Sequence, residues 1–360
     1  MNDFLIIGGG IAGLSAGARL SHLGRVTLLE MESALGYHSS GRSAALFEET
    51  YGAPSVVALN RASKSYLQSA NGGVLSPRGM LLVGSRDRAQ VFADDVQRME
   101  MTPITMDHAV QLFPILNRDV VDRAAFHPDA WDIDTDLLLQ NFARDIRSNG
   151  NLIVTRGQVT GIRRTPSGWE VSTAKETYQG HILVNAAGAW ADRVATMAGI
   201  APIGFTPLRR SMARIAAPAG YDVSGWPMIF GPGENWYVKP DAGALIVSPA
   251  EEDPTEPHDA FADDMVLAEG LARYEAHVIT PVTRMLANWA GLRTFSPDRQ
   301  LVLGPAPQES RFIWSAGQGG YGFQTSPAAS QLVADLVAGV SPAVDAATVA
   351  ATSPARFAQV

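Results

Sequence analysis

The chain begins with a pattern of apolar positions that changes period twice. Residues 4–7 are continuously apolar, as expected for a strand buried on both faces, and they run into the glycine-spaced segment 8–13. Apolar positions then recur at helical spacing until about Gly24, and a second apolar run over residues 26–29 ends at Glu30. This order predicts a strand, a tight glycine turn, a helix and a second, parallel strand.

The glycine turn has the spacing of a dinucleotide-binding fingerprint, Gly-x-Gly-x-x-Gly. Gly8 permits the tight turn, Gly10 lets the backbone approach a pyrophosphate, and Gly13 lets the helix pack closely on the strand. The helix N-terminus offers free N–H groups to phosphate oxygens, and Glu30 is placed to accept a hydrogen bond from a ribose hydroxyl. A plain turn without a ligand is the alternative. The residues expected at the dinucleotide are Gly8, Gly10, Ile11, Ala12, Gly13 and Glu30.

The segment that follows favours FAD over NAD. Residues 32–45 are rich in Gly, Ser and Ala, and such small residues allow a flat ring to approach closely. We expect Arg42 to contact phosphate, with a solvated loop arginine as the alternative, and His38 to contact the ribityl chain or the loop. Because the chain has no cysteine, a flavin linked through a Cys sulfur is excluded, and non-covalent FAD is expected. The expected contacts are His38, Ser39, Arg42, Ser43 and Ala44.

A second strand–glycine–helix pattern lies in the middle of the chain. Residues 151–180 show alternating strands with a turn signal at 166–168, and the apolar run 181–185 leads into a glycine and a helix. We interpret this as a small β unit inserted in the dinucleotide domain, with Val159 beside the adenine. The expected cofactor contacts here are Val159, Ala187, Gly188 and Trp190.

These patterns predict an α/β fold: a Rossmann-like FAD-binding domain with an inserted substrate domain of α+β type built on a mixed β-sheet. A hairpin is expected around residues 241–243, and a helix over 135–149 with Asp134 or Thr135 as its N-cap. The expected FAD-binding domain is discontinuous, with segments 1–75, 141–203 and 286–360, and the substrate domain consists of 76–140 and 204–285.

A second glycine cluster lies near the end of the chain, in residues 317–322. It follows an apolar strand and precedes a helix, for which Ser326 is the predicted N-cap and Pro327 the first residue. A helix N-terminus favours nearby negative charge, which reduced flavin carries at N1 and the C2 carbonyl. A glycine-rich turn without a ligand is the alternative. The residues expected at the flavin are Gly319, Gly320, Tyr321, Gly322, Phe323, Gln324 and Thr325.

Composition limits the classes of partner. The net charge of −8 without a basic block argues against nucleic acid. No apolar run reaches the ~18–20 residues of a membrane span, and no signal-peptide pattern is visible, so a cytoplasmic monomer or loose homodimer is expected. The acidic stretch 251–264 is interpreted as a solvated loop, and no metal site is expected at His258 and Asp259.

Two arginines and two tyrosines are candidates for binding an anionic substrate. Arg210 lies on a predicted strand, and Arg293 follows an apolar Trp-Ala-Gly-Leu stretch. A guanidinium group can hold a carboxylate through two parallel hydrogen bonds, and the hydroxyls of Tyr51 and Tyr237 could add donors. For each residue alone, a structural role is the alternative.

The chain resembles flavin enzymes of the D-amino-acid oxidase and glycine oxidase type, with bacterial D-arginine dehydrogenase as the closest likeness. The resemblance spans nearly the whole chain and rests on "IIGGGIAG", "GYHSSGRSAA", "VNAAGAWAD", "RRS", "WPM", "YVKPDAG", "WAGLRTF" and "AGQGGYGFQTS". It implies that Arg210, Arg293, Tyr51 and Tyr237 hold the substrate carboxylate and that the Gly320 carbonyl takes the amine. It also implies hydride transfer from Cα to flavin N5, giving an imino acid that hydrolyses to a keto acid and ammonia.

The chain departs from D-arginine dehydrogenase at side-chain positions. Leu46 stands where that enzyme has a histidine, Gly79 or Met80 where it has a glutamate that pairs with the guanidinium, and Phe230 where it has a small aliphatic residue. Each change makes the pocket more apolar, so we expect neutral or hydrophobic D-amino acids as preferred substrates. Glu48 or Glu49 supplying a substitute acid is the alternative. The expected pocket residues are Leu46, Glu48, Met80, Met228 and Phe230.

Other activities stay open at this point. The same carboxylate clamp suits a sarcosine-like amine or an L-2-hydroxy acid, and a non-catalytic flavoprotein or a purely NAD(P)-binding protein are alternatives of another class. The electron acceptor, whether a quinone, another acceptor or O2, is not given by the residues, and D over L stereochemistry follows from the resemblance alone.

Overall fold

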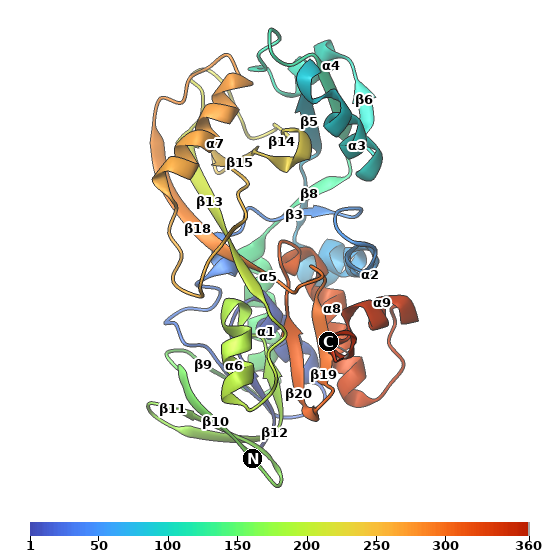
Figure 1. The fold of residues 1–360 in the computed structure, drawn as a ribbon, viewed down its shortest axis with the longest axis vertical. Coiled ribbons are helices and arrows are strands. Elements are labelled where there is room, and N and C mark those ends of the chain that lie inside the picture. Colours follow the sequence, from blue (N-terminus) through green and yellow to red (C-terminus); the bar gives the residue numbers. More distant parts are fainter. Residues whose placement is uncertain (359–360) are drawn as a thin grey trace.

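Five parallel strands form the centre of the lower lobe in Figure 1. The computed structural model describes residues 1–358. The strands lie in the order β9, β2, β1, β12 and β20, with bounds Leu152–Val154, Val26–Leu29, Asn2–Ile7, Thr177–Asn185 and Glu309–Ala316. The predicted strand–turn–helix–strand unit at the N-terminus is therefore confirmed.

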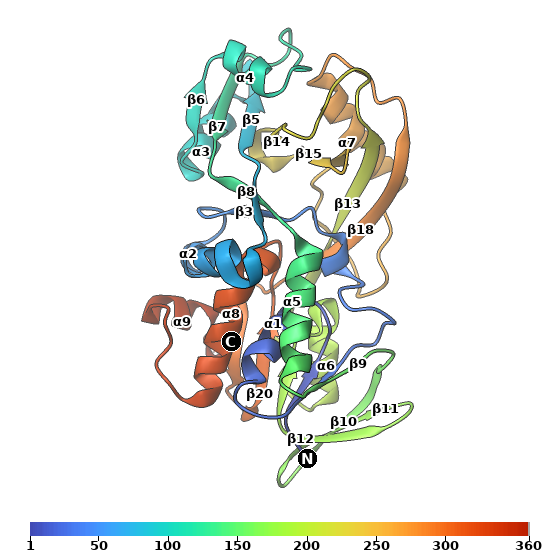
Figure 2. The ribbon, with the colours of Figure 1, turned by 180° about the vertical axis from the view of Figure 1, so that it is seen from behind.

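Further strands and helices complete this lobe. Antiparallel strands extend its sheet: β10 (Val159–Thr165), β11 (Gly168–Thr173) and β19 (Val302–Ala306). Helices α1 (Ile11–Leu20), α5 (Thr135–Ser148) and α8 (Gly322–Ala338) lie side by side in front of the sheet in Figure 2. On the other face, α6 (Ala191–Met197) packs against β10 and β12.

Helix α5 forms where the sequence predicts it. The side chain of Asp134 accepts a hydrogen bond from the backbone N–H of Leu137, which satisfies one of the free donors at the helix start. Leu138, Phe142 and Ile146 are buried, in keeping with their helical spacing. The helix thereby covers the parallel sheet beside α1.

The upper lobe is a nine-stranded mixed sheet with helices packed against both of its faces. Its strand order is β6, β7, β5, β14, β15, β16 and β13, followed by β17, with β18 also paired to β13. The bounds are Thr102–Ile104, Arg123–His127, Met80–Gly84, Met228–Phe230, Tyr237–Asp241, Ala244–Ser248, Thr206–Ala216, Asp253–Pro254 and Met285–Phe295. The hairpin of β15 and β16 turns at residues 242–243, as predicted.

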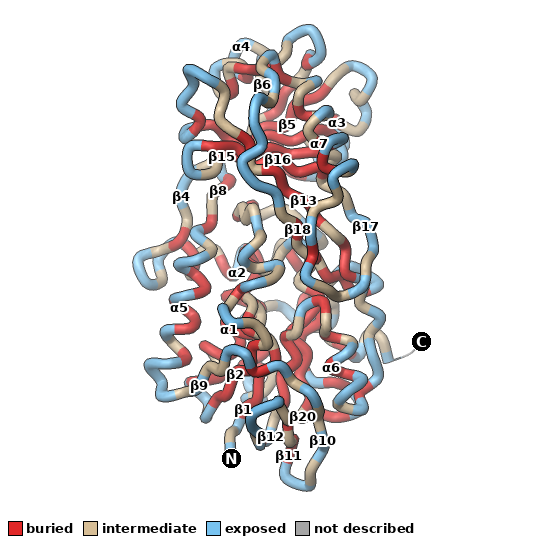
Figure 3. The backbone as a smooth tube through the Cα atoms, turned by 90° about the vertical axis from the view of Figure 1, so that its left-hand side faces the viewer, coloured by how far each residue is buried: buried red, intermediate tan, exposed pale blue. Residues whose placement is uncertain are grey.

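Strand alternation divides the upper lobe into two apolar layers, and Figure 3 shows the strands buried. Leu81 and Val83 face the cluster that contains residues of α4 (Met106–Leu112) and α7 (Asp264–Ala276). Met80 and Leu82 face the opposite way, into a cluster with Phe230 that also receives Met99 at the end of α3 (Ala89–Arg98). This second layer faces the lower lobe and becomes part of the site.

Strands β13 and β18 form a long antiparallel ribbon that runs along both lobes in Figure 1. Pairing extends from Thr206 opposite Phe295 to Ile215 opposite Met285. A small sheet of β3 (Leu46–Glu48), β8 (Ala130–Ile133) and β4 (Leu75–Pro77) lies between the lobes, and α2 (Pro54–Ser69) follows β3.

The division of the chain into an FAD-binding domain and a substrate domain stays a prediction. All strands of the eight-stranded sheet fall in the segments expected for the FAD-binding domain, whereas β18 pairs with the other sheet.

The start of α8 differs from the prediction. The helix begins at Gly322, and Ser326 and Pro327 lie inside it. Pro327 has no N–H for the carbonyl of Phe323, and the hydroxyl of Ser326 donates to that carbonyl at 2.9 Å instead. The predicted N-cap was therefore wrong, and the helix N-terminus lies one turn closer to the glycine cluster.

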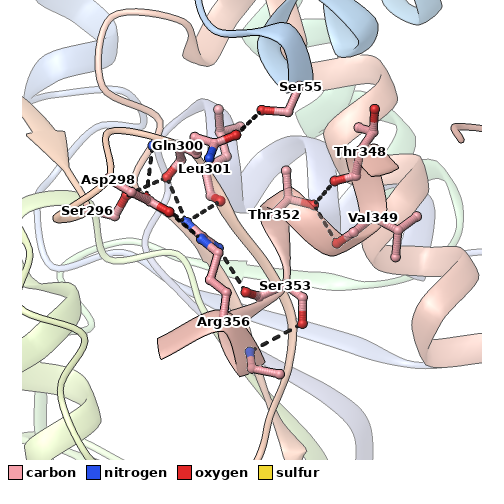
Figure 4. Close-up of polar contacts among 11 residues, drawn as sticks. Ser55, Ser296, Asp298, Gln300, Leu301, Thr348, Val349, Thr352, Ser353 and Arg356 are labelled. Atoms are coloured by element: carbon pink, nitrogen blue, oxygen red, sulfur yellow. Dashed lines mark hydrogen bonds and ion pairs between the residues drawn. The ribbon is translucent and has the colours of Figure 1, made fainter. Parts of the chain in front are cut away.

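The C-terminal segment is hydrogen-bonded to the loop that follows β18 (Figure 4). Arg356 forms two hydrogen bonds with the Asp298 carboxylate, at 2.7 and 3.0 Å, and also donates to the Gln300 carbonyl. The side chain of Gln300 accepts from Ser55 of α2 at 2.7 Å. Arg356 lies just after α9 (Ala346–Thr352), and its contacts fix the loop that follows β18.

Across residues 1–358, no helix is long and apolar enough to cross a membrane.

Candidate active site

Two cavities meet between the glycine clusters. Cavity A, of about 220 Å³, lies between the lobes and reaches Arg210 and Arg293. Cavity B, of about 330 Å³, lies in the lower lobe and reaches Glu30 and Val159. They share five lining residues: Gly10, Ser39, Ser40, Ala186 and Gly188. Together the cavities form one elongated space suited to an extended ligand.

The carboxyl ends of β1 and β2 form one wall of cavity B. Gly8 has φ of +111°, and a Cβ there would overlap the Ala186 carbonyl. A Cβ on Gly13 would overlap the Gly8 carbonyl, so this glycine lets α1 pack on the turn as expected. Gly13 itself lines neither cavity.

Glu30 holds the turn as well as facing cavity B. Its Oε2 accepts from the N–H of Gly9 at 2.6 Å, and its Oε1 accepts from the N–H of Glu32 at 2.8 Å. The ring of His38 lies 4.7 Å from that of Trp190, and its Nε2 lies 3.0 Å from the Glu32 carboxylate. Cavity B is therefore bordered by the carboxylate of Glu30 and by the rings of His38 and Trp190.

Ser40, where the two cavities meet, was not among the predicted residues. Its hydroxyl oxygen accepts a hydrogen bond from the N–H of Ile11 at 3.0 Å, directly at the start of α1. A Cβ on Gly10 would lie 3.2 Å from the same oxygen. The N–H groups of the helix start and the absent Cβ leave a polar surface at this junction. In the sequence, Ser40 was indicated only by its place in the Ser-rich segment.

Arg42 lines cavity A, but its guanidinium is bound by protein groups. It donates to the carbonyls of Ala260 and Ala290 at 2.7 and 2.9 Å and pairs with Asp259. The phosphate contact predicted for Arg42 therefore competes with three internal acceptors. The stretch 251–264 is correspondingly more than a solvated loop, because it packs on this arginine.

Arg210 and Arg293 face the same cavity from neighbouring strands. Arg293 lies opposite Leu208 in the β13–β18 ribbon, so Arg210, two residues further along β13, projects from the same face. Arg210 is 6% exposed, and its Nε donates to the Glu251 carbonyl while Glu252 lies 3.4 Å from Nη2. Burial and the neighbouring Arg293 charge lower the pKa of Arg210. The side chain of Arg293 has no hydrogen-bond or ion-pair partner within residues 1–358.

Tyr51 and Tyr237 add hydroxyl groups to this cavity. Within residues 1–358, the only hydrogen-bond partner of the Tyr237 hydroxyl is the sulfur of Met212, a weak acceptor at 3.2 Å, so its proton is available to an oxygen ligand. The Tyr51 hydroxyl donates to the Glu234 carboxylate at 2.8 Å. Burial and the Glu234 charge raise the pKa of Tyr51, which keeps it a neutral donor.

Gly320 lies against the Arg293 guanidinium. A Cβ on Gly320 would lie 3.1 Å from Nη1 and 3.3 Å from Cζ of Arg293, closer than nearly all real contacts. The preceding Gly319 has φ of +51°, and a Cβ there would overlap the ring of Phe295. The glycine cluster therefore allows the loop to pass directly beside the Arg293 guanidinium, and both line cavity A.

Part of cavity A is lined by large apolar side chains together with two acids. We call this part the side-chain wall, because we expect it to contact the side chain of a substrate. Its apolar members are Leu46, Met80, Met99, Met212, Met228 and Phe230, of which Met99 and Met212 were not predicted. Glu48 and Glu234 also line the cavity, whereas Glu49 pairs with Lys64 and Arg61 away from it. Of these two acids, Glu48 was among the expected pocket residues and Glu234 was not. Glu234 was missed because it lies in a turn, at φ of +53°, rather than in a motif.

Most of the predicted site residues line one of the two cavities. In cavity A these are Gly10, Ile11, Ala12, Ser39, Arg42, Ser43, Ala44, Leu46, Glu48, Tyr51, Met80, Gly188, Arg210, Met228, Phe230, Tyr237, Arg293, Gly319, Gly320, Gly322, Phe323 and Gln324. In cavity B they are Gly8, Gly10, Glu30, His38, Ser39, Val159, Ala187, Gly188 and Trp190. Gly13, Tyr321 and Thr325 line neither.

Tyr321 and Thr325 have internal partners. The Tyr321 ring packs on those of Tyr51 and Phe295, and the Thr325 hydroxyl donates to the Tyr321 carbonyl at 2.8 Å. Both residues stabilise the first turn of α8. Neither forms a surface of the shared space.

The sequence profile of the family described as DAO, FAD dependent oxidoreductase, matches residues 3–336. The chain belongs to the DAO family. A Bos taurus relative, FAD-dependent oxidoreductase domain-containing protein 1, is 25% identical over 402 aligned residues, covering 93% of this chain and 81% of the relative. A glycine oxidase from Geobacillus kaustophilus is also 25% identical, covering 93% of this chain and 92% of its own.

Solved structures share the DAO fold. The crystal structure of glycine oxidase from Geobacillus kaustophilus matches with a TM-score of 0.81 at 23% identity, over 96% of both chains. L-α-glycerophosphate oxidase from Mycoplasma pneumoniae with FAD bound matches with a TM-score of 0.83 at 20% identity, over 94% of both chains. As a DAO-family member, this protein is an FAD-dependent oxidoreductase.

The residues present fit the cofactor of the DAO family. The two cavities share a boundary, with a helix start and missing Cβ atoms at their junction, where the pyrophosphate of a dinucleotide could lie. Among the residues that the structure describes, the buried Gln324 has no partner for its Nε2, and Thr294 has none for its Oγ1; both line cavity A. Unpartnered buried donors of this kind suit the carbonyl and nitrogen acceptors of a flavin ring.

Proposed function

We propose that this enzyme oxidises D-amino acids to imino acids, which hydrolyse to 2-keto acids and ammonia. The observation that carries the proposal is the pair of guanidinium groups on one face of the β13–β18 ribbon, with Arg293 unpartnered within residues 1–358. A buried and a half-buried positive charge that face one cavity favour an anion, and a carboxylate matches them in size and geometry.

The residues of cavity A can hold and orient the substrate. Arg210 and Arg293 bind the carboxylate, and the Tyr237 hydroxyl donates to it. The Tyr51 hydroxyl donates to it as well once it turns away from Glu234. The Gly320 carbonyl accepts a hydrogen from the amine. Bound FAD supplies the acceptor for the hydride that leaves Cα, and holding the substrate in one orientation supplies much of the rate. Water then adds to the imino acid, and ammonia leaves.

The wall formed by Leu46, Met80, Met228 and Phe230 supports neutral or hydrophobic side chains. Flexible methionine side chains adapt to ligands of different shape and make favourable contacts with aromatic rings. The D configuration rests on the resemblance to D-amino-acid enzymes. The electrons leave to a quinone, another acceptor or O2.

Anaerobic reduction of the bound flavin tests this proposal directly. The flavin absorbance is followed against a panel of D- and L-amino acids, sarcosine and L-2-hydroxy acids. Bleaching by neutral D-amino acids is expected. Bleaching by only sarcosine, an L-amino acid or a hydroxy acid would leave the carboxylate clamp in place and reject the D-amino acid assignment. A flavin that no substrate reduces would indicate a non-catalytic flavoprotein.

The proposal includes a cytoplasmic enzyme that works as a monomer or loose homodimer, without nucleic acid. The net charge of −8 and the lack of cysteine support it. Cell fractionation and size-exclusion chromatography with light scattering test the compartment and the oligomeric state.

A further inference from the structure

We propose that Glu48 is a specificity residue that selects substrates whose side chain carries a hydrogen-bond donor. This inference rests on the proposed function, because it names the side-chain class that the same cavity takes. The donor is either neutral, as in a phenol or indole, or cationic, as in an ammonium or guanidinium group.

Strand alternation directs Glu48 toward the cavity. In β3, the ring of Phe47 is fully buried in the core of the lower lobe. Leu46 and Glu48, on either side of it in the sequence, both line cavity A. The carboxyl group therefore lies on the cavity face of the strand, and the residue is only 2% exposed.

The Glu48 carboxylate keeps unused acceptor capacity. The N–H of Thr50 donates to Oε1 at 3.0 Å, and the Thr50 hydroxyl lies 3.0 Å from Oε1 and 3.1 Å from Oε2. Oε1 can thus take the N–H while Oε2 takes the hydroxyl proton, and Nε2 of His127 lies 3.4 Å from Oε1. A carboxylate oxygen can accept two hydrogen bonds, so Oε2 keeps room for a further donor, which a ligand could supply.

The surroundings define what the rest of the side chain must be. His127 pairs with Met80 in the register of β5 and β7, so the carboxylate lies beside the apolar wall that Met80 and Leu46 form. A fitting side chain has an apolar body that contacts this wall and a donor at its tip. D-Tyrosine, D-tryptophan, D-lysine and D-arginine have this form, whereas D-phenylalanine and D-leucine lack the donor.

Hydrogen bonds with two buried side chains fix the backbone of the segment that carries Glu48. The buried amide of Asn60 donates to the carbonyls of Glu48 and Tyr51 at 3.3 and 3.1 Å. The N–H of Glu48 donates to the side-chain oxygen of Gln324 at 3.2 Å. A carboxylate fixed by such contacts distinguishes substrates, because only a ligand with a donor at this position uses its remaining acceptor capacity.

Two pairs of substrates, each differing by one donor, test the proposal. D-Tyrosine and D-phenylalanine differ by a hydroxyl, and D-lysine and D-norleucine differ by an ammonium group. We expect the wild-type enzyme to prefer the donor in at least one pair by about tenfold or more in kcat/KM. Glu48→Leu is expected to bring that ratio to within about threefold of unity. The matched control is Glu49→Gln, whose side chain pairs with Lys64 outside the cavity and which should keep the wild-type ratio.

The outcomes separate the two levels of the proposal. The pair that responds identifies a neutral or a cationic donor. A wild-type enzyme without preference in either pair, or a ratio unchanged in Glu48→Leu, overturns the role of Glu48 and leaves the proposed function standing. A wild-type flavin that no D-amino acid reduces overturns both. If Glu48→Leu does not retain FAD, Glu48→Gln replaces it. Gln keeps an acceptor oxygen without the charge, so a cationic preference must fall.

Discussion

The two ends of the shared space are built in different ways. Cavity B is formed by the carboxyl ends of parallel strands in one sheet and by the turns directly after them. Cavity A collects residues from both lobes, from the small sheet between them and from the loop before α8. The comparison teaches that the cofactor end is determined by local motifs, whereas the substrate end depends on how distant segments come together.

The largest expected effect is at the substrate end. Replacing Arg293 by Met removes a guanidinium that has no other partner within residues 1–358, so the loss falls on the ligand. Loss of one partner of a buried charge pair costs about 2–4 kcal/mol, or roughly 30- to 1,000-fold in kcat/KM, mainly through KM. Steady-state kinetics measure this, with FAD content as the control. An unchanged kcat/KM would show that Arg293 does not bind the substrate carboxylate. The proposed difference between the two cavities would then lose its main support.

The second prediction concerns the junction of the cavities. Gly10→Val is compatible with the backbone, at φ of −82°, but it adds side-chain atoms next to the Ser40 hydroxyl. We expect the dissociation constant of FAD to rise by at least about tenfold, since the backbone no longer approaches the pyrophosphate. Fluorescence titration of the apoprotein measures the constant. Arg293→Met, titrated in parallel, should bind FAD like the wild type. Equal weakening in both variants would show that the two ends are not separable.

The third prediction concerns how the glycine loop supports the clamp. In Gly320→Ala, the added methyl group presses on the Arg293 guanidinium. Displacement of a positioning group by a fraction of an ångström to 1 Å lowers the rate, and we expect about a tenfold loss in kcat/KM with FAD retained. Binding of a carboxylate inhibitor, followed by the flavin spectrum, reports the clamp directly. An inhibitor constant equal to that of the wild type would contradict the assigned contact.

The smallest expected effect is on stability and concerns pH. Burial raises the pKa of Glu48 above its ordinary value of 4.5, and the hydrogen bonds from Thr50 offset part of this rise. A carboxyl group whose pKa is raised on folding contributes stability below its unfolded pKa and loses it as the pH rises through the folded pKa. The free energy of unfolding of Glu48→Gln, relative to the wild type, should therefore increase from about pH 4.5 to pH 7. Urea unfolding of both proteins at the two pH values measures this. A difference that falls over this interval would contradict the sign.

The fold could be predicted from the sequence where pattern and geometry act over short distances. The turn at Gly8 and the capped helix at Asp134 follow from neighbouring residues, and both appear in the structure. The start of α8 could not be predicted in this way. Pro327 resembles a first helical residue, but the Ser326 hydroxyl replaces the missing hydrogen bond and allows the helix to begin at Gly322.

The substrate end could be predicted only in part. A strand pattern shows that Met212 is buried, but it does not show which face of the sheet borders a cavity. Glu234 comes from a turn, and it reaches Tyr51 because Arg98 of α3 and the α3 carboxylate of Asp95 hold that turn. Such contacts join segments over a hundred residues apart. No local pattern in the sequence records them.

The β13–β18 ribbon carries both arginines that we propose to bind the substrate carboxylate, and the side-chain wall comes mainly from other segments. The spacing of Arg210 and Arg293 is therefore set by strand register, which a substitution at Leu46, Met80 or Phe230 does not alter. Recognition of the acid group and choice of the side chain are thus separable tasks for protein engineering. A library that varies the wall alone would explore new substrates while every member inherits the same grip on the carboxylate.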